Sequence, residues 1–297
     1  MKLRYALVFF VTALVTFLLL RDRWPRPAEP TPMAVVAAPT LTAPAPAAMP
    51  PASKPKAKAP KVAVVPSGPP EEAYQKFVPY RVVDNFAIAY GDVILGSVDE
   101  DTPPEGFHEP SPIHLWTERE IPYGIATSLP NPGRVEDAVR YLTKATNLVF
   151  VPLVDQPDGI VFEPGSEHCL SALGKVGGRQ PIRLDGNCGR TEILHEILHA
   201  LGFLHEHSRG DRDQFVEVLW DNIDPKYKDQ FRILPATIED PARGTPFDLR
   251  SIMLYPSNLF GKQEGLVTLR ARNGQLLAPV RDGLSPADIR RLRDIYP

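Results

Sequence analysis

Apolar and polar positions divide the chain into regions with different patterns. An uncharged, mostly apolar run between residues 5 and 20 follows Lys2 and Arg4. This run is longer than most signal-peptide cores and short for a membrane-spanning helix. We interpret residues 1–23 as either a signal anchor or a cleaved signal peptide. Both interpretations predict that the rest of the chain is exported.

Further along the chain, the pattern takes on the periods of folded secondary structure. Apolar residues recur at helical spacing within residues 133–145, namely at Val135, Ala138, Val139 and Leu142. Strand-like runs are predicted at residues 120–127, 148–154, 160–163 and 182–185. Two further helices are expected to begin with Thr191 and Ser285 as N-caps. These elements predict one folded domain over residues 113–297.

Composition changes the picture mainly near the N-terminus. The chain has 34 Pro among 297 residues, and many of them lie in residues 24–70 together with Ala and spaced Lys. Such a segment cannot bury a core and favours extended, polyproline-like conformations. We interpret it as a linker, which either holds a domain away from a membrane or only joins two parts. The formal net charge of −3, without a dense basic block, gives no indication of nucleic-acid binding.

The chain has two cysteines, Cys169 and Cys188. An even number fits one disulfide in an oxidising compartment, whereas two free buried thiols would fit a reducing one. Because the N-terminal pattern predicts export, we expect the two residues to form a disulfide.

The strongest candidate for a functional site is a group of three histidines and a glutamate, close together in the sequence. His195 and His199 stand four residues apart, so on a helix both rings project from one face and can share a metal ion. His205 can join them only if the helix stops and the chain turns back. Gly202 can adopt the left-handed conformation that ends a helix. Glu196 lies beside this site, where it suits a base acting on water.

This spacing predicts a zinc site with one open position. Three protein ligands leave the fourth tetrahedral position to water, as a catalytic zinc site requires. The alternative is a helix with ordinary surface histidines, which leaves the register of Gly202 and His205 unexplained. We therefore predict one zinc ion per chain.

The string H-E-x-x-H-x-x-G-x-x-H resembles that of the metzincin proteases. Its continuation, with Phe203, Glu206 and Arg209, is similar to the astacin family in particular, and the resemblance extends from about residue 115 to 296. It implies a two-lobed α+β fold, with a mainly β N-terminal lobe that holds the zinc helix and an irregular C-terminal lobe. It also implies a polypeptide substrate between the lobes and a monomeric catalytic domain.

Residues 248–255 resemble the family's turn that carries a methionine beneath the metal. The resemblance implies that Met253 supports the histidines from below. It also implies that Tyr255 is a displaceable metal ligand whose hydroxyl can hydrogen-bond to the oxyanion. Leu254 stands where the family form has a histidine, so that residue's role does not carry over.

Residues 71–112 resemble the propeptide of bacterial astacin-like precursors. Within them, residues 81–96 alternate apolar positions around Gly91 and Asp92, similar to the family stretch Gly-Asp-Ile/Val-x-Leu-Gly. The family's aspartate at this place can occupy the zinc position in the latent form, and Asp92 matches it. The aromatic that often stands three residues earlier is Ala89 here. The alternative is an ordinary aspartate in a turn.

These observations predict a zinc endopeptidase that hydrolyses extracytoplasmic proteins. Glu196 would take the proton of the attacking water and pass it to the leaving amine. The protein would lie in the cell envelope, anchored by its N-terminal segment, or would be secreted if that segment is cleaved. Alternatives are a metzincin similar to serralysins, an envelope binding protein that has lost catalysis, and a membrane-tethered spacer. Glu206 directly after His205 favours the astacin family.

Overall fold

The computed structural model describes residues 40–41, 78–99, 107, 112–235, 238, 241 and 244–297. The predicted signal segment at residues 1–23 therefore lies outside the described residues, as does the predicted linker apart from residues 40–41. Among the described residues, no helix has both the length and the apolar character that a membrane span requires. The domain boundaries drawn from the sequence stay predictions.

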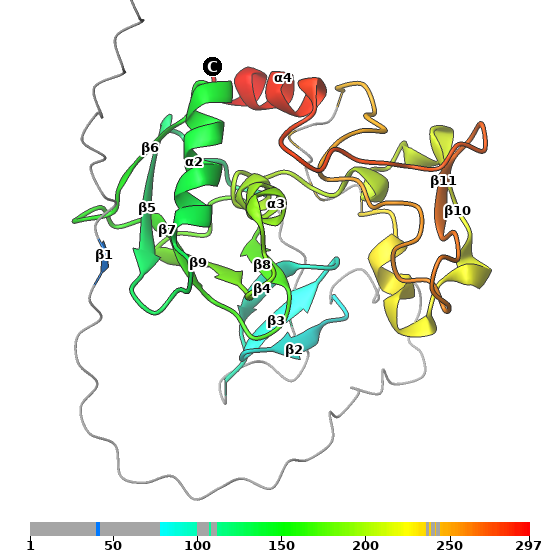
Figure 1. Cartoon of the computed structure of the whole chain (residues 1–297), viewed down its shortest axis with the longest axis horizontal. Helices are drawn as coiled ribbons and strands as arrows, with labels where there is room; N and C mark the ends of the chain where they lie inside the picture. The colour runs from blue at the N-terminus through cyan, green and yellow to red at the C-terminus, as the bar shows by residue number, and fades with distance from the viewer. Residues whose placement is uncertain are drawn as a thin grey trace, which may run out of the picture. The chain divides into compact units, whose positions relative to one another are not determined.

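A mixed β-sheet forms the framework of the N-terminal lobe (Figure 1). Along the sheet the described strands follow the order β1-β5-β7-β9-β8-β4-β3-β2, and β6 also pairs with β5. Their bounds are β1 Thr40–Leu41, β2 Arg81–Val83, β3 Phe86–Ala89, β4 Val93–Ser97, β5 Glu120–Ala126, β6 Val149–Pro152, β7 Gly159–Pro164, β8 Cys169–Ala172 and β9 Arg179–Leu184. The strands predicted from the sequence in residues 120–185 all occur, with ends that coincide or differ by up to three residues.

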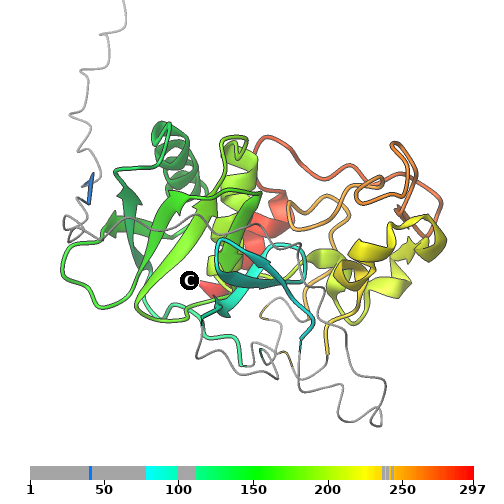
Figure 2. The same cartoon turned by 90° about the horizontal axis from the view of Figure 1, so that it is seen from below.

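Strand β8 reverses the direction of the sheet. Strands β5, β7 and β9 are mutually parallel, whereas β8 runs antiparallel to β9. Strand β4 then pairs with β8 through Val93↔Ser171 and Ile94↔Ala172. Strands β2, β3 and β4 form a three-stranded antiparallel unit, which we call the hairpin. In Figure 2 this unit, drawn in cyan, lies beside the green strands of the sheet. The segment that resembles a propeptide is therefore built into the same sheet as the predicted catalytic domain.

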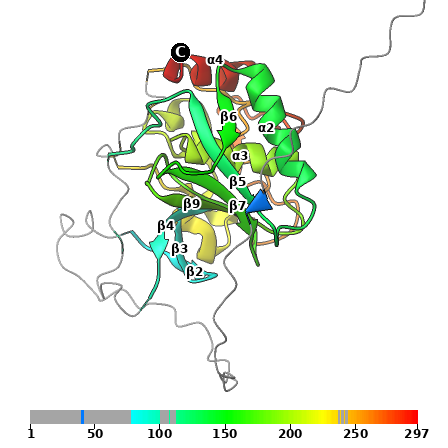
Figure 3. The ribbon, with the colours of Figure 1, turned by 90° about the vertical axis from the view of Figure 1, so that its left-hand side faces the viewer.

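Two helices pack against this sheet, and Figure 3 shows them with β5 and β7. They are α2 (Gly133–Ala145), which has the predicted bounds, and α3 (Arg190–Ala200). Alternate residues of β5 share a core with both helices, as do residues of β7 and β9: Ile121, Tyr123, Ile125, Ile160, Phe162, Ile182, Val135, Leu142, Ile193 and Ile197. This core fixes the position and rotation of α3.

The predicted N-cap of α3 is wrong by two residues. The helix begins at Arg190, with Gly189 as its N-cap. The backbone N–H of Gly189 donates to the carboxylate of Glu192 at 3.0 Å, which satisfies a donor that the helix itself leaves free. The hydroxyl of Thr191 instead donates to the carbonyl of Arg281.

The chain after α3 is mostly irregular and forms a second lobe, as predicted. It contains the short 3₁₀ helices Glu206–Ser208, Arg212–Gln214, Trp220–Asn222 and Pro225–Phe231, and the antiparallel strands β10 (Val216–Val218) and β11 (Leu269–Ala271). Its separate core includes Val216, Ile223, Phe231, Leu254 and Leu269. The last helix, α4 (Pro286–Ile295), has Ser285 as its N-cap, as predicted, and packs Leu292 into the first core.

Candidate metal centre

The end of α3 brings the three histidines together. His195 and His199 lie on the helix, and the backbone turns at Gly202, whose φ is 95°. A side chain there would also meet Leu115, because an added Cβ would lie 2.5 Å from Leu115 Cδ2. Glycine is therefore required for both its conformation and its small size. The turn returns His205 to the face of the helix that carries the other two rings.

The Nε2 atoms of these histidines converge on the carboxylate of Asp92. One oxygen of Asp92 lies 3.1 Å from His199 Nε2 and 3.5 Å from His205 Nε2, and the other lies 3.4 Å from His195 Nε2. The candidate ligand atoms of all four residues lie within 4.8 Å of one another. Three imidazoles and one carboxylate are a donor set that tetrahedral zinc accepts.

Two polar atoms of this cluster support a metal rather than a hydrogen-bonded core. His199 Nε2 and Asp92 Oδ1 are buried, and neither has a hydrogen-bond partner among the described residues. Buried polar atoms are normally paired, so such atoms need an explanation. A zinc ion between the four side chains would provide it, and the residues present therefore fit this metal.

The other ring nitrogen of His195 and that of His199 are each held by a backbone carbonyl. His195 Nδ1 lies 2.9 Å from the carbonyl of Ile252, and His199 Nδ1 lies 2.8 Å from that of Phe203. Because a carbonyl only accepts, the Nδ1–H must donate in each pair. The lone pair of Nε2 then points at the centre, which is the tautomer that a metal ligand needs.

The two carboxyl groups at the cluster have pKa values that are shifted in opposite directions, lowered for Asp92 and raised for Glu196. Burial raises the pKa of the Asp92 carboxyl, but the charges of His205 and His199 outweigh this and hold it well below its usual range. Burial raises the pKa of Glu196 well above its usual range, and the negative charge of Asp92 adds to the effect. Glu196 therefore lies next to the cluster as a group with high proton affinity.

Tyr255 borders the cluster from the second lobe. Its ring centroid lies 4.9 Å from that of His205 and 3.8 Å from that of His207. Its hydroxyl faces Gly91 so closely that an added Cβ would clash with the oxygen. Glycine thus lets the backbone before Asp92 approach Tyr255. Sequence reasoning did not identify His207, which is fully buried against this ring.

Met253 lies in a turn that α4 supports. It is buried, and its carbonyl accepts from the backbone N–H of Glu206 at 2.9 Å. Asp288 of α4 accepts from Ser251 Oγ at 2.7 Å and from the N–H of Ile252 at 3.0 Å. The carbonyl of the same Ile252 holds His195. Sequence reasoning missed Asp288, although its place three residues after the N-cap Ser285 is a capping-box signal.

A cleft of about 550 Å³ opens onto the cluster. Asp92, His195, Glu196 and Tyr255 lie at its base, and its walls include the disulfide between Cys169 and Cys188. The sulfurs are 2.11 Å apart, so the predicted pairing is confirmed. The disulfide joins the start of β8 to the loop before α3, beside the candidate centre.

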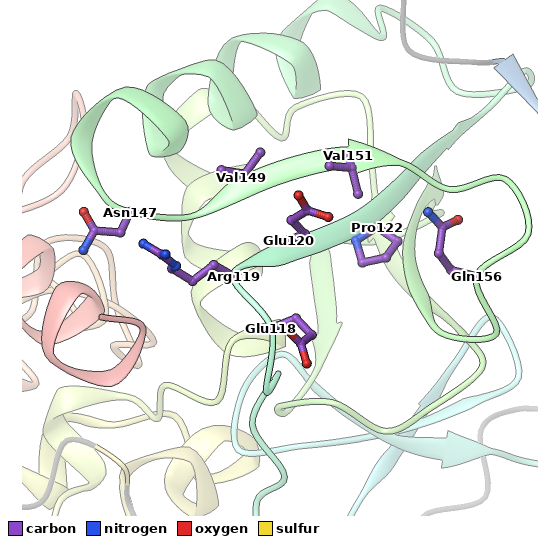
Figure 4. A pocket seen from close by; sticks show the side chains of 8 residues that line it. All are labelled: Glu118, Arg119, Glu120, Pro122, Asn147, Val149, Val151 and Gln156. Carbon is purple, nitrogen blue, oxygen red and sulfur yellow. The ribbon is translucent and has the colours of Figure 1, made fainter.

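A second hollow, of about 610 Å³, lies over β5 and β6 (Figure 4). Its lining mixes charged, polar and apolar side chains: Glu118, Arg119, Glu120, Pro122, Asn147, Val149, Val151 and Gln156. It contains no residue of the histidine cluster and no histidine or cysteine of its own. The first cleft is therefore the one that reaches the cluster, through Asp92, His195, Glu196 and Tyr255, whereas His199 and His205 are buried and do not line it.

Comparisons with known proteins agree with this geometry. The sequence model of the family described as Astacin, a peptidase family, matches residues 108–297. Zinc metalloproteinase nas-6 of Caenorhabditis elegans is 36% identical over 186 residues, which cover 61% of this chain and 53% of that protein. Zinc metalloproteinase nas-8 of Steinernema carpocapsae is 33% identical over 191 residues, or 63% of this chain and 45% of that protein. The chain thus spans about half the length of these curated relatives.

A solved structure shares the fold. High choriolytic enzyme 1, a hatching enzyme zinc-protease from Oryzias latipes, superposes with a TM-score of 0.57 at 30% sequence identity. The match covers 61% of this chain and 94% of that one. The shared part is the two-lobed α+β domain described above.

Proposed function

The chain belongs to the astacin family of zinc metalloproteinases, and from this premise we propose that it is a zinc endopeptidase that cleaves polypeptides in the cleft between its lobes. The observation that carries the proposal is the convergence of three Nε2 atoms on the carboxylate of Asp92, with Glu196 lining the same cleft as His195 and Asp92. His195, His199 and His205 would hold the zinc ion. When bound, zinc lowers the pKa of a water and polarises the substrate carbonyl.

Glu196 is the residue that moves the proton. It is buried, its Oε2 has no hydrogen-bond partner among the described residues, and its pKa is raised by burial. Such a carboxylate accepts a proton from the attacking water and can later release it to the leaving amine. Tyr255 contributes differently, because its hydroxyl can donate to the oxyanion that forms on the substrate. Met253 and Glu206 keep the histidines in place from beneath.

We further propose that the chain as described is latent. Asp92 fills the position at the three histidines that an attacking water needs, and its segment blocks the edge of β8. Activity would then require that residues 71–112 be cut from the catalytic domain, residues 113–297, or displaced. A carboxylate is a competent zinc ligand, so this block needs no other group.

The natural substrates are inferred to be extracytoplasmic proteins. A disulfide persists in oxidising compartments, and the N-terminal apolar run is typical of an export signal. On this basis the enzyme would act in the cell envelope or after secretion, as a monomeric catalytic domain. If the apolar run is not cleaved, it would tether the enzyme to a membrane.

Metal analysis combined with a protease assay tests the proposal. The processed protein should hydrolyse an unfolded protein, and a chelator should abolish the hydrolysis. His195→Ala, His199→Ala and His205→Ala should each lose stoichiometric zinc, whereas His168→Ala, at an exposed position on the rim of the cleft, should keep it. Full zinc occupancy in any of the three variants would refute the ligand assignment. A folded, zinc-loaded, processed protein without hydrolysis would favour a binding protein instead.

A further inference from the structure

A second carboxylate of the β2–β4 hairpin contacts the predicted catalytic domain far from the histidines. Asp84 stands at the tip of the hairpin, in the two-residue turn between β2 and β3. Its φ is 49° and that of Asn85 is 65°, so both residues are left-handed. Asp and Asn tolerate this conformation better than most residues, and it is the one that tight hairpin turns require. The turn projects the Asp84 side chain towards β9.

Three donors surround the Asp84 carboxylate. One oxygen accepts from the backbone N–H of Ser166 at 2.9 Å and from Arg183 Nη2 at 3.0 Å. The other accepts from the hydroxyl of Ser166. The hydrogen bonds of Ser166 lower the pKa of Asp84, and Arg183 lowers it further. Both oxygens are therefore recognised as those of an ionised carboxylate.

On the side of the catalytic domain, Arg183 is held by a second carboxylate, because its Nη1 pairs with Glu163 of the neighbouring strand β7 at 3.1 Å. Its guanidinium also lies 5.8 Å from the ring of Phe86, at the start of β3, which is a further contact with the hairpin. The side chains of Asp84 and Arg183 are 18% and 19% exposed, so solvent screens them only in part. An isolated surface ion pair adds little to stability, whereas this carboxylate has a guanidinium, a hydroxyl and an amide as partners.

The remaining links between hairpin and domain are strand pairing, apolar contacts and one longer ion pair. Val93 of β4 shares a core with Leu173 and Leu204, and Arg81 Nη1 of β2 lies 3.9 Å from Glu167. Strand β4 pairs with β8 at two positions. A small core joins Val83, Ile88 and Ile94 of the hairpin to Leu170 of β8. Asp92 at the histidines and Asp84 at Ser166 and Arg183 are charged contacts at opposite ends of the hairpin.

We propose that Ser166 and Arg183 form a carboxylate-binding site on the catalytic domain, and that Asp84 is its ligand in the uncut chain. This site anchors the hairpin independently of the metal centre. The anchor raises the local concentration of Asp92 at the histidines, because a segment bound at one point finds its second point more often. That the anchor helps to inhibit a peptidase rests on the proposed function, whereas the binding of Asp84 to Ser166 and Arg183 does not.

Hydrogen exchange of the full-length, uncut protein in a chelator tests the anchor without any proteolysis. Asp84→Asn keeps the size of the side chain and tolerates the left-handed turn, so it removes only the charge. We expect amides of residues 81–97 to exchange about tenfold faster, as loss of a charged hydrogen bond predicts. Ser166→Ala should give a smaller increase. Combining Asp84→Asn with Arg183→Gln should add little to the larger single effect, because both remove the same contact.

Asp158→Asn is the matched control. Asp158 pairs with Lys175 at 2.8 Å and accepts from the N–H of Gly178 at 2.7 Å, but it lies outside the hairpin. It should leave exchange in residues 81–97 at the wild-type rate. Unchanged hairpin exchange in Asp84→Asn, strictly additive effects in the double variant, or an equal rise across α3 and β7 would each overturn the proposal. None of these results depends on whether the protein is a peptidase, so the two proposals fail separately.

Discussion

Arg291 donates two hydrogen bonds of 2.8 Å to the carboxylate of Glu206, the residue that follows His205. Both side chains are nearly inaccessible to solvent. Arg209 and the backbone N–H of Asp248 complete the partners of the same carboxylate, at 3.2 Å and 2.7 Å. The last helix of the chain is thereby tied to the third histidine. Burial nonetheless raises the pKa of Glu206, so its charge depends on these partners.

Arg291→Gln should therefore destabilise the protein strongly. Leaving a buried charge without any partner costs about 3–5 kcal/mol. Because Arg209 still pairs with Glu206 in this variant, the loss should approach the lower end of this range. Urea unfolding of the full chain measures this loss, and a zinc titration should show weaker binding because His205 is less well held. Arg293→Gln is the control, since Arg293 is exposed on the same helix and, among the described residues, donates to the carbonyl of Ala145 alone. Equal stability of the two variants would contradict the expectation.

Glu196→Gln should separate catalysis from metal binding. The amide has nearly the same shape but cannot accept the proton of the attacking water. Turnover by the processed protein should fall by about a hundredfold to ten-thousandfold, the usual range for a general base. Zinc content and the thermal unfolding midpoint should stay close to wild type. Near wild-type turnover would remove Glu196 from this role, and loss of zinc would make it a ligand instead.

The histidine cluster was predictable because its ligands lie within eleven consecutive residues, so their spacing alone indicates how they meet. Helical spacing places His195 beside His199, and Gly202 provides the turn that returns His205. The supporting contacts were not predictable in the same way. The bonds of Arg291 to Glu206 and of Asp288 to the Met253 turn join residues that are distant in the chain. Spacing along a sequence carries no information about such partners.

In the fold, too, elements set by neighbouring residues were predictable, whereas pairings between distant segments were not. The bounds of α2 follow from its helical period, and its Val135 and Leu142 are fully buried. Strand β8 was not predicted, because Cys169–Ala172 contains no β-branched or aromatic residue, the types that favour strands. The pairing of β4 with β8 depends on register between distant segments. The apolar alternation of residues 81–96 carried no information about the strand with which this segment pairs.

Loss of the disulfide should lower stability by about 3 kcal/mol, as the chain-entropy model suggests for a loop of this length. Cys169 and Cys188 are 19 residues apart, and Cys188 is buried in the first core. The double variant Cys169→Ser, Cys188→Ser should therefore unfold at lower urea concentration than wild type. Wild type measured with a strong reductant should approach the variant. Labelling of both cysteines by a thiol reagent in native, unreduced protein would show that the bond does not form in solution.

Docking of the hairpin should weaken in acid because of Asp84. Its pKa is lowered when it binds Ser166 and Arg183, so the bound state favours the ionised form. The stabilisation is fully present above the unbound pKa of about 3.9 and is lost as pH falls through the lower, bound value. Protection factors of residues 81–97, which are corrected for intrinsic exchange, should therefore drop below about pH 4. Asp92 has a lowered pKa as well, so the difference between wild type and Asp84→Asn is the quantity to follow. That difference should shrink in acid and be constant above about pH 5.

Removing the Asp92 carboxylate should activate the uncut chain. Asp92 lies between the three Nε2 atoms, where an attacking water would have to be. Asp92→Ala deletes the competing group, while the hairpin keeps Asp84 and its apolar contacts. The purified, uncut variant should hydrolyse an unfolded protein substrate, with mass spectrometry showing that no processing has occurred. Uncut wild type and the control Asp158→Ala should remain inactive.

A ligand-binding measurement makes the same test without turnover. A small hydroxamate binds zinc through its oxygens only if a coordination position is open. Calorimetry should detect tight binding to zinc-loaded, uncut Asp92→Ala and much weaker binding to uncut wild type, since Asp92 must first leave in the latter. Equal affinity for the two intact proteins, together with equal low activity, would show that the hairpin blocks the cleft through its backbone. In that case Asp92 would be an ordinary residue of the turn, and latency would depend on the pairing of β4 with β8.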